Sequence, residues 1–182
     1  MKAFLIRHAQ STGQAADAPL TDRGYQDARA LVPTLIEREA GPLFASPMRR
    51  AVETLTPYAE HSGQTIRRLD SLRERLLSPT PLTDWETHIQ RSFQDPNHAP
   101  EGGESHTDLL ARWTSAFAEI TQNGGTPAFV THGGMTSALF HSLTAEFGFQ
   151  GWKQLRNPDL FEVTLTKGRL SAFTRIELET YP

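Results

Sequence analysis

The sequence predicts one α/β domain, a three-layer αβα sandwich with a mainly parallel central sheet. Short apolar segments alternate with segments whose apolar residues recur at helical spacing, which is typical of a parallel sheet covered by helices on both faces. A length of 182 residues suits a single domain over residues 1–182. The chain has no internal repeat or low-complexity tract that would indicate another architecture.

The first strand and the first helix come from clear apolar patterns. Residues 3–6 are four consecutive apolar residues between Lys2 and Arg7, which predicts a buried strand. A polar loop continues to about Asp22, and a helix follows it. The apolar stripe of this helix consists of Ala28, Leu31, Val32, Leu35 and Ile36.

The next elements are bounded by glycine and proline. Gly41 and Pro42 end the first helix, and residues 43–45 form a short buried strand. Ser46 is expected to cap a second helix that has Pro47 at its first position. Gly63 ends that helix, and residues 65–69 predict a third strand.

Residues 76–103 depart from the alternating pattern. They carry four prolines and one short helical pattern over residues 85–93. We expect this segment to be a cap-like excursion from the main fold. Ser105 and Asp108 then match a capping box at the start of another helix. Its apolar stripe is Leu109, Trp113, Phe117 and Ile120.

The last third of the chain returns to strands. Residues 127–131 predict the fourth strand, and residues 135–143 predict the helix after it. Residues 161–165 and 170–176 flank a Lys167-Gly168 turn, which predicts a terminal hairpin.

Composition excludes several classes of function. A formal net charge of −3 gives no reason to expect a nucleic-acid or membrane partner. The absence of cysteine excludes disulfides, zinc–thiolate sites and cysteine nucleophiles. No apolar run approaches the roughly 20 residues that span a bilayer. Because Met1 and Lys2 lead straight into the first strand, we expect no signal peptide and a cytoplasmic protein.

Charged residues follow several of the predicted strands. Ligands of parallel sheets bind beyond the carboxyl ends of the strands, so these residues are expected to meet at one edge. Arg7 and Arg50 carry forked donors that match phosphate oxygens. Gly133 opens a helix whose backbone N–H groups add affinity for anions.

A histidine and a glutamate supply the reactive groups of such a site. His8 is the natural nucleophile, because a neutral imidazole can attack phosphorus. Neighbouring cations should lower its pKa and keep it neutral. Glu74 can protonate the leaving oxygen. Taken singly, these residues also fit structural roles: Arg7-His8 as a strand-end contact, Gly133-Gly134 as a turn, and Arg73 and Arg75 as solvated charges.

Six segments of the chain resemble the histidine phosphatase superfamily, also called phosphoglycerate mutase-like, and they occur in family order. Arg7-His8-Ala9-Gln10-Ser11 resembles the R-H-G-E-[ST] signature. The others are L-T-x-x-G at residues 20–24, S-x-x-x-R-A-x-x-T at 46–54, L-x-E at 72–74, G-E-S at 103–105 and V-x-H-G-G at 130–134.

The resemblance implies a role for each matching residue. His8 would be the nucleophile and Glu74 the proton donor and acceptor, with no metal or cofactor. The implied phosphate ligands are Arg7, Arg50, His132, Gln14 and Gly133. Two residues depart from the signature, since Ala9 replaces glycine and Gln10 replaces glutamate. Gln14 stands where the family often has asparagine.

The function expected from these residues is a phosphoric monoester hydrolase of the histidine acid phosphatase type. It would act through a phosphohistidine on a small phosphorylated substrate, without a metal. A phosphoglycerate-type mutase is the first alternative, although the short 76–103 segment favours a more open site that water can enter. A regulatory module that binds a phosphorylated ligand is the second. Substrate and oligomeric state stay open.

Side chains of the excursion could touch the substrate. The candidates are Trp85, His88, Arg91, His98 and Glu101. Lys153 and Arg156 are expected on a solvated surface instead.

Overall fold

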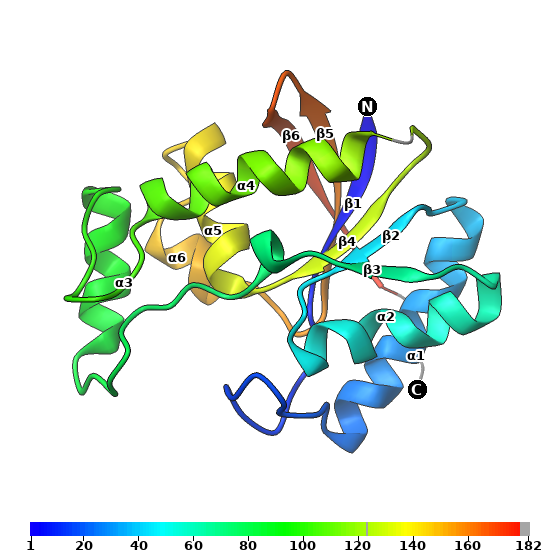
Figure 1. Ribbon diagram of the computed structural model, residues 1–182, viewed down its shortest axis with the longest axis horizontal. Helices are drawn as coiled ribbons and strands as arrows, with labels where there is room; N and C mark the ends of the chain where they lie inside the picture. The colour runs from blue at the N-terminus through cyan, green and yellow to red at the C-terminus, as the bar shows by residue number, and fades with distance from the viewer. Residues whose placement is uncertain (123, 179–182) are drawn as a thin grey trace.

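The computed structural model describes residues 1–122 and 124–178, and it has the predicted α/β architecture (Figure 1). Its six-stranded sheet has the order β3-β2-β4-β1-β5-β6. The strands are β1 (Lys2–Arg7), β2 (Leu43–Ala45), β3 (Ile66–Arg68), β4 (Ala128–Thr131), β5 (Asp159–Thr166) and β6 (Arg169–Ile176). The helices are α1 (Asp22–Glu37), α2 (Arg49–Ser62), η1 (Asp70–Leu72, a 3₁₀ turn), α3 (Trp85–Gln94), α4 (His106–Thr121), α5 (Gly133–Leu143) and α6 (Phe149–Lys153).

The sheet is mainly parallel, as predicted. β1 pairs in parallel with β4, β4 with β2, and β2 with β3. The predicted terminal hairpin is β5 and β6, and it adds to β1 in antiparallel order. The carboxyl ends of four parallel strands therefore lie at one edge, where crossover connections leave room for a ligand.

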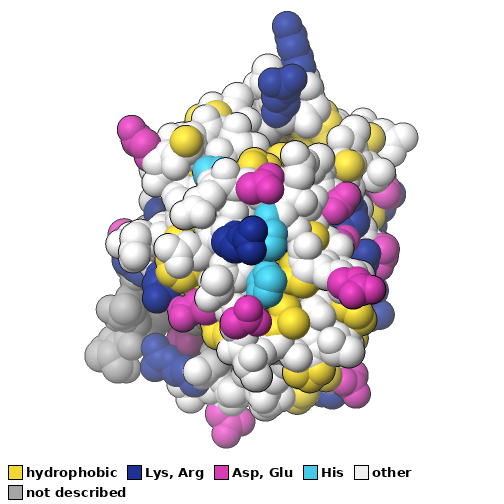
Figure 2. All heavy atoms as spheres, turned by 90° about the vertical axis from the view of Figure 1, so that its left-hand side faces the viewer, with side chains coloured by type: hydrophobic (Ala, Val, Ile, Leu, Met, Phe, Trp, Pro, Cys, Tyr) yellow, Lys and Arg dark blue, Asp and Glu magenta, His cyan; other side chains and the backbone are white. Residues whose placement is uncertain are grey.

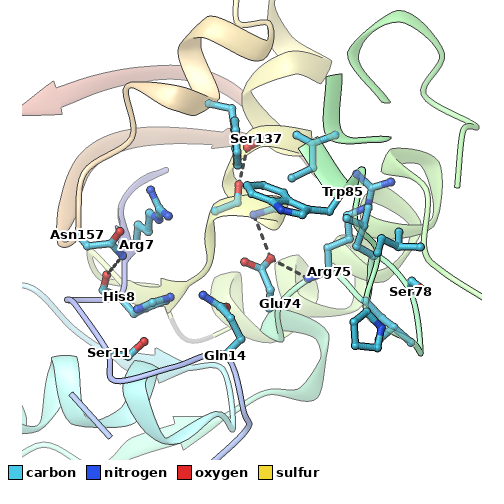
Figure 3. A pocket seen from close by; sticks show the side chains of 18 of the residues that line it. Arg7, His8, Ser11, Gln14, Glu74, Arg75, Ser78, Trp85, Ser137 and Asn157 are labelled. Atoms are coloured by element: carbon cyan, nitrogen blue, oxygen red, sulfur yellow. Dashed lines mark hydrogen bonds between the residues drawn. The ribbon is translucent and has the colours of Figure 1, made fainter. Parts of the chain in front are cut away.

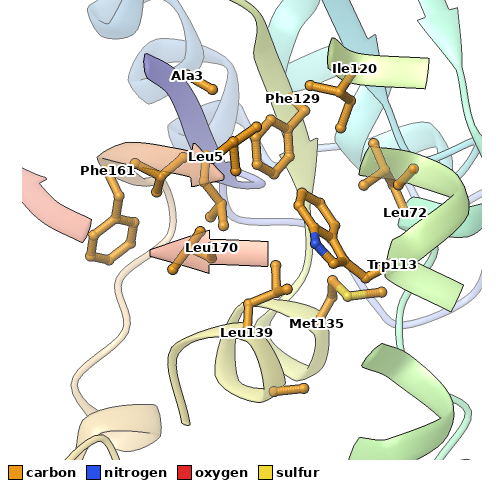
Figure 4. Packing of buried hydrophobic residues seen from close by; sticks show 14 of the residues in the cluster. Ala3, Leu5, Leu72, Trp113, Ile120, Phe129, Met135, Leu139, Phe161 and Leu170 are labelled. Atoms are coloured by element: carbon orange, nitrogen blue, oxygen red, sulfur yellow. The ribbon is translucent and has the colours of Figure 1, made fainter. Parts of the chain in front are cut away.

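Helices cover both faces of the sheet, so the three layers are confirmed. In Figure 1, α1 and α2 lie on one side of the strands, and α4 and α5 lie on the other. Alternate residues of β1 supply both cores, because successive strand side chains point to opposite faces. Phe4 and Ile6 join the cluster under α1 and α2. Leu5 joins Trp113 and neighbouring apolar residues under α4 and α5 (Figure 4).

Most predicted helix ends are correct, and one is wrong. Ser105 and Asp108 form the predicted capping box of α4, and Gly63 ends α2 in the left-handed conformation with φ of 67°. The prediction that Ser46 caps α2 is wrong: the helix begins at Arg49, with Met48 as its cap residue. The Ser46 hydroxyl is hydrogen-bonded to His132 instead.

The segment over residues 76–103 contains the predicted short helix, α3. Its two ends meet, because the Leu76 N–H donates to the Glu104 carboxylate (2.8 Å) and the Glu104 N–H donates to the Leu76 carbonyl (2.7 Å). α3 lies beside α6, which the apolar pattern did not predict. Seen from this side, charged side chains of both signs are interspersed over the surface (Figure 2). Within residues 1–122 and 124–178, no helix is long and apolar enough to cross a membrane.

Candidate active site

His8 follows the carboxyl end of β1 and is only 6% exposed. Its Nδ1 lies 2.7 Å from the Ala9 carbonyl oxygen. A carbonyl only accepts, so the proton must be on Nδ1 and the lone pair on Nε2. Arg50 donates its Nε–H to this Nε2 at 3.2 Å. The Nε2 atom is therefore the nucleophilic nitrogen of the ring.

The pKa of His8 is lowered to about 3. Burial is the main cause, and the charges of Arg50 and Arg7 add to it, while the bond to Ala9 opposes it. The predicted direction is confirmed, but desolvation outweighs the neighbouring cations that were expected to dominate. The imidazole is consequently neutral throughout the physiological pH range.

Hydrogen bonds from three segments hold the His8 backbone. The His8 N–H donates to the Thr131 carbonyl of β4 at 3.1 Å. The Ala9 N–H donates to Thr54 Oγ1 at 2.9 Å, and Asn157 Nδ2 donates to the His8 carbonyl at 2.7 Å (Figure 3). Asn157 was not predicted, because it stands in a loop with no periodic pattern around it.

Arg7 ends β1 and lies over the start of α5. Its Nη1 donates to the Leu155 carbonyl at 2.8 Å, while its buried Nε has no partner among the described residues. A Cβ atom on Gly133 would lie 3.3 Å from the guanidinium. The absence of that Cβ lets Arg7 lie against the helix N-terminus. Both residues line the pocket, as predicted.

Glu74 follows η1 and faces the same pocket. Its Oε1 accepts hydrogen bonds from the Arg75 N–H at 2.7 Å and the Gly134 N–H at 3.0 Å (Figure 3). A Cβ atom on Gly134 would lie 2.5 Å from that oxygen, so only glycine fits. Burial raises the pKa of Glu74, and the two N–H bonds and the charges of Arg7 and Arg50 only partly offset this. Glu74 therefore holds its proton at pH values where an ordinary glutamate is ionised.

Arg50 and His132 lie behind His8 rather than on the pocket wall. Arg50 is 1% exposed and also donates to the Ala15 carbonyl at 2.9 Å. The ring of His132 is fully buried, 4.9 Å from the His8 ring, and its Nε2 lies 2.8 Å from Ser46 Oγ. His132 Nδ1 is buried without a partner in the described part of the chain. Both side chains contact His8 but do not line the cavity.

The pocket in front of His8 has a volume of about 910 Å³. Its polar wall includes Gln10, Ser11 and Gln14, which follow the first strand. Of the excursion residues expected near the substrate, only Trp85 lines it. His88 and His98 bond to each other instead, at 2.9 Å, and Arg91 and Glu101 lie off the wall.

Arg75 is not the solvated charge that the sequence suggested. It is half-buried and lines the pocket. Its Nε donates to the Glu104 carbonyl at 2.6 Å and its Nη1 donates to Ser92 Oγ at 2.8 Å. No local sequence signal separates it from Arg73, which pairs with Glu104 nearer the surface.

The two departures from the family signature have different surroundings. The Ala9 side chain is fully buried in a small cluster with Leu20 and Ala28, so its extra methyl does not enter the pocket. The Gln10 side chain lines the pocket and accepts a hydrogen bond from the Thr21 hydroxyl at 3.1 Å. The first departure therefore leaves the shape of the pocket unchanged, and the second removes a negative charge from it.

In residues 1–122 and 124–178, no group of three or more His, Asp or Glu side chains is placed to hold a metal ion.

Comparisons with known proteins show the family of the chain. The family model of the histidine phosphatase superfamily (branch 1) matches residues 3–174. A glucosyl-3-phosphoglycerate phosphatase of Mycobacterium tuberculosis is 30% identical over 172 residues, covering 78% of this chain and 74% of the relative. A probable phosphatase of Schizosaccharomyces pombe is 27% identical over 161 residues, covering 82% and 76%.

A solved structure extends the match to three dimensions. The mycobacterial glucosyl-3-phosphoglycerate phosphatase in complex with VO3 is 26% identical and aligns with a TM-score of 0.71, covering 90% of this chain and 92% of that one. Sequence, fold and site geometry thus agree. The chain belongs to the histidine phosphatase superfamily and is a phosphatase that hydrolyses phosphate esters.

Proposed function

We propose that this protein hydrolyses the phosphate monoester of a small metabolite through a phosphohistidine at His8, without a metal. One observation carries the proposal. A neutral imidazole with its lone pair on Nε2 and a carboxyl group with a raised pKa face the same pocket. A nucleophile and an acid of this kind are what a two-step phosphoryl transfer requires.

The two steps balance as follows. His8 Nε2 attacks phosphorus, and the ester oxygen leaves with the proton of Glu74. A water molecule then gives a proton to the Glu74 carboxylate and attacks the phosphohistidine. Inorganic phosphate leaves, His8 is neutral again and Glu74 is protonated. Arg7 and Arg50 offset the charge on the phosphoryl oxygens, and phosphate would take over the hydrogen bond that Arg50 now gives to His8.

The raised pKa of Glu74 supports the acid phosphatase type. The first step needs the protonated carboxyl, so turnover should be highest in the acid to neutral range. The relatives support a small metabolite as substrate, since one is a glucosyl-3-phosphoglycerate phosphatase. The VO3 complex of the mycobacterial enzyme makes vanadate a suitable probe.

A phosphatase is supported over the mutase alternative. A mutase must also hold a second anionic group of its substrate, and among the described residues the only other cation on the pocket wall is Arg75. That guanidinium donates into the excursion rather than into the cavity. A purely regulatory module would not need an acid poised beside a neutral nucleophile.

Hydrolysis of 4-nitrophenyl phosphate in excess chelator tests the proposal. We expect His8→Ala to lose at least about 10³-fold in kcat/KM, since nucleophile removal leaves only binding contributions. His61→Ala, at an exposed position on α2, is the matched control and should keep wild-type activity. Quenching in alkaline denaturant should trap a phosphohistidine in the wild type, because its P–N bond is stable to base and labile to acid. Turnover that survives in His8→Ala would contradict the mechanism.

A further inference from the structure

We propose that the alcohol part of the substrate carries an uncharged apolar ring and that Trp85 selects it. This inference rests on the proposed hydrolysis at His8. The part of the pocket away from Arg7 and His8 is built mainly from the excursion and α6. We call it the ring wall, and it consists of Leu77, Pro81, Leu82, Trp85, Ile89 and Trp152.

Trp85 is the most exposed large side chain of the ring wall, at 45%. Large aromatic residues are usually better buried, and an exposed one in a concave site is a common mark of ligand contact. Figure 3 shows its indole beside the cavity that also contains Glu74 and His8. A ring bound there would cover surface that water now contacts.

The indole is held in place before any ligand binds. Trp85 meets Trp152 edge to face, with ring centroids 6.1 Å apart, and Trp152 stacks on Phe149 at 5.4 Å. Lys153 of α6 also pairs with Glu86 of α3 at 3.2 Å. Two helices far apart in the sequence thus support one aromatic surface, which reduces the entropy lost on binding.

Charge argues for an uncharged ring. Beyond Arg7 and His8, the charged residues on the described pocket wall are Glu74 and Arg75. All three guanidinium nitrogens of Arg75 already donate to protein acceptors: the Ser92 hydroxyl and the His98 carbonyl in the excursion, and the Glu104 carbonyl just after it. A carboxylate on the alcohol would therefore lose its hydration without gaining a cation.

Neutral polar groups complete the wall of the pocket. Gln10, Ser11 and Gln14 come from the loop after β1, and Ser78 and Thr80 come from the excursion. They can pair with hydroxyl or amide substituents at little cost in solvation. The predicted substrate class is the monoester of a ring-bearing, neutral alcohol.

Two matched esters test this selection, 4-carbamoylbenzyl phosphate and 4-carboxybenzyl phosphate. They differ in one charge, and the methylene group keeps the leaving oxygen nearly constant. We expect the wild type to favour the carbamoyl ester by at least about tenfold in kcat/KM, because the buried carboxylate lacks a partner. Glycerol 1-phosphate serves as an ester without a ring.

Substitution of Trp85 assigns the selection to one residue. Trp85→Ala should lower the ratio of kcat/KM for the carbamoyl ester to that for glycerol 1-phosphate by about tenfold, the usual scale of one aromatic contact. Trp85→Phe should retain most of the ratio. Ile36→Ala removes an exposed apolar side chain outside the pocket and should leave the ratio unchanged. Thermal unfolding verifies that each variant is folded.

Three results would overturn the inference, and they are distinguishable. A preference for the carboxylate ester, with turnover intact, would overturn the selection for an uncharged ring but not the proposed hydrolysis. An unchanged ester ratio in folded Trp85→Ala would do the same. Absence of wild-type turnover on all three esters would instead overturn the proposed hydrolysis, and the ring selection with it.

Discussion

At the scale of single residues, the site shifts the pKa values of His8 and Glu74 in opposite directions. Burial lowers the pKa of His8 to about 3 and raises that of Glu74. Each shift favours the neutral form, so the base lacks a proton at pH values where the acid still keeps one. Pairs of groups driven apart in this way are typical of acid–base chemistry in enzymes.

The pH profile should reflect these two shifts. Below the pKa of His8, about 3, the nucleophile is protonated and activity falls. Above the raised pKa of Glu74, the acid has lost its proton and activity falls again. Glu74→Gln should abolish the alkaline limb and lower kcat for alkyl esters by about 10²- to 10⁴-fold. A pH series of kcat/KM tests this, and an alkaline limb that persists in Glu74→Gln would contradict the assignment.

Gly134 gives a second prediction at this scale. A Cβ atom in Gly134→Ala would lie 2.5 Å from Glu74 Oε1 and 2.7 Å from the Arg75 Cβ, so the carboxyl must move. We expect kcat to fall by about 10- to 100-fold, as for a misplaced acid. Gly148→Ala is the control, because nothing lies within 4 Å of its added Cβ. Steady-state kinetics of both variants provide the comparison.

At the scale of elements, one carboxylate ties the excursion to the main fold. Glu104 pairs with Arg73 at 3.2 Å and with Arg112 at 3.2 Å, and it accepts from the Leu76 N–H. Arg112 in turn donates to the Ser71 and Arg73 carbonyls next to Glu74. The position of the acid therefore depends on contacts made by α4.

Removal of the Glu104 carboxylate should weaken the attachment of the excursion to the main fold. Glu104→Ala leaves Arg112 half-buried beside unpaired groups and should cost about 2 kcal/mol of unfolding free energy. The matched control is Glu119→Ala, which removes an exposed pair with Arg67 and should change stability by less than about 0.5 kcal/mol. Urea unfolding measures both. Equal effects of the two substitutions would refute the role given to Glu104.

Many of the helices and strands could be predicted from the sequence, because the periodicity of apolar residues indicates which side chains are buried. The run over residues 3–6 and the capping box at Ser105 both gave correct elements. The prediction that Ser46 caps α2 was wrong, because its hydroxyl is hydrogen-bonded to His132, a residue far away in the sequence. The burial of Arg75 and the ring wall also depend on distant partners, so no local pattern reveals them. The motif residues lie close together, as predicted. The sequence did not predict that Arg50 and His132 would lie behind His8 instead of on the pocket wall.

At the scale of the whole molecule, buried histidines should make the fold sensitive to acid. The pKa values of His8 and His106 are lowered to about 3, and that of His132 lies well below its usual value, each mainly through burial. In the unfolded chain these groups bind protons near pH 6.5. Between about pH 6.5 and 3 the unfolded state thus binds more protons, and stability falls as the pH falls.

His106 allows this to be measured apart from catalysis. It lies in a buried aromatic cluster with Phe93 and His141, away from the pocket wall. His106→Leu should reduce the slope of unfolding free energy against pH by about one proton below pH 6. Urea unfolding between pH 4 and 7 gives the slope. A slope in His106→Leu equal to that of the wild type would contradict the prediction.

The closure of the excursion has a consequence for how this protein can diversify. Leu76 and Glu104 are 28 positions apart in the chain, yet they are joined by hydrogen bonds in both directions. The two ends of the segment between them are therefore fixed relative to each other. The residues of this segment can change, and with them the pocket wall and the range of esters that bind, while His8 keeps its position and its chemistry.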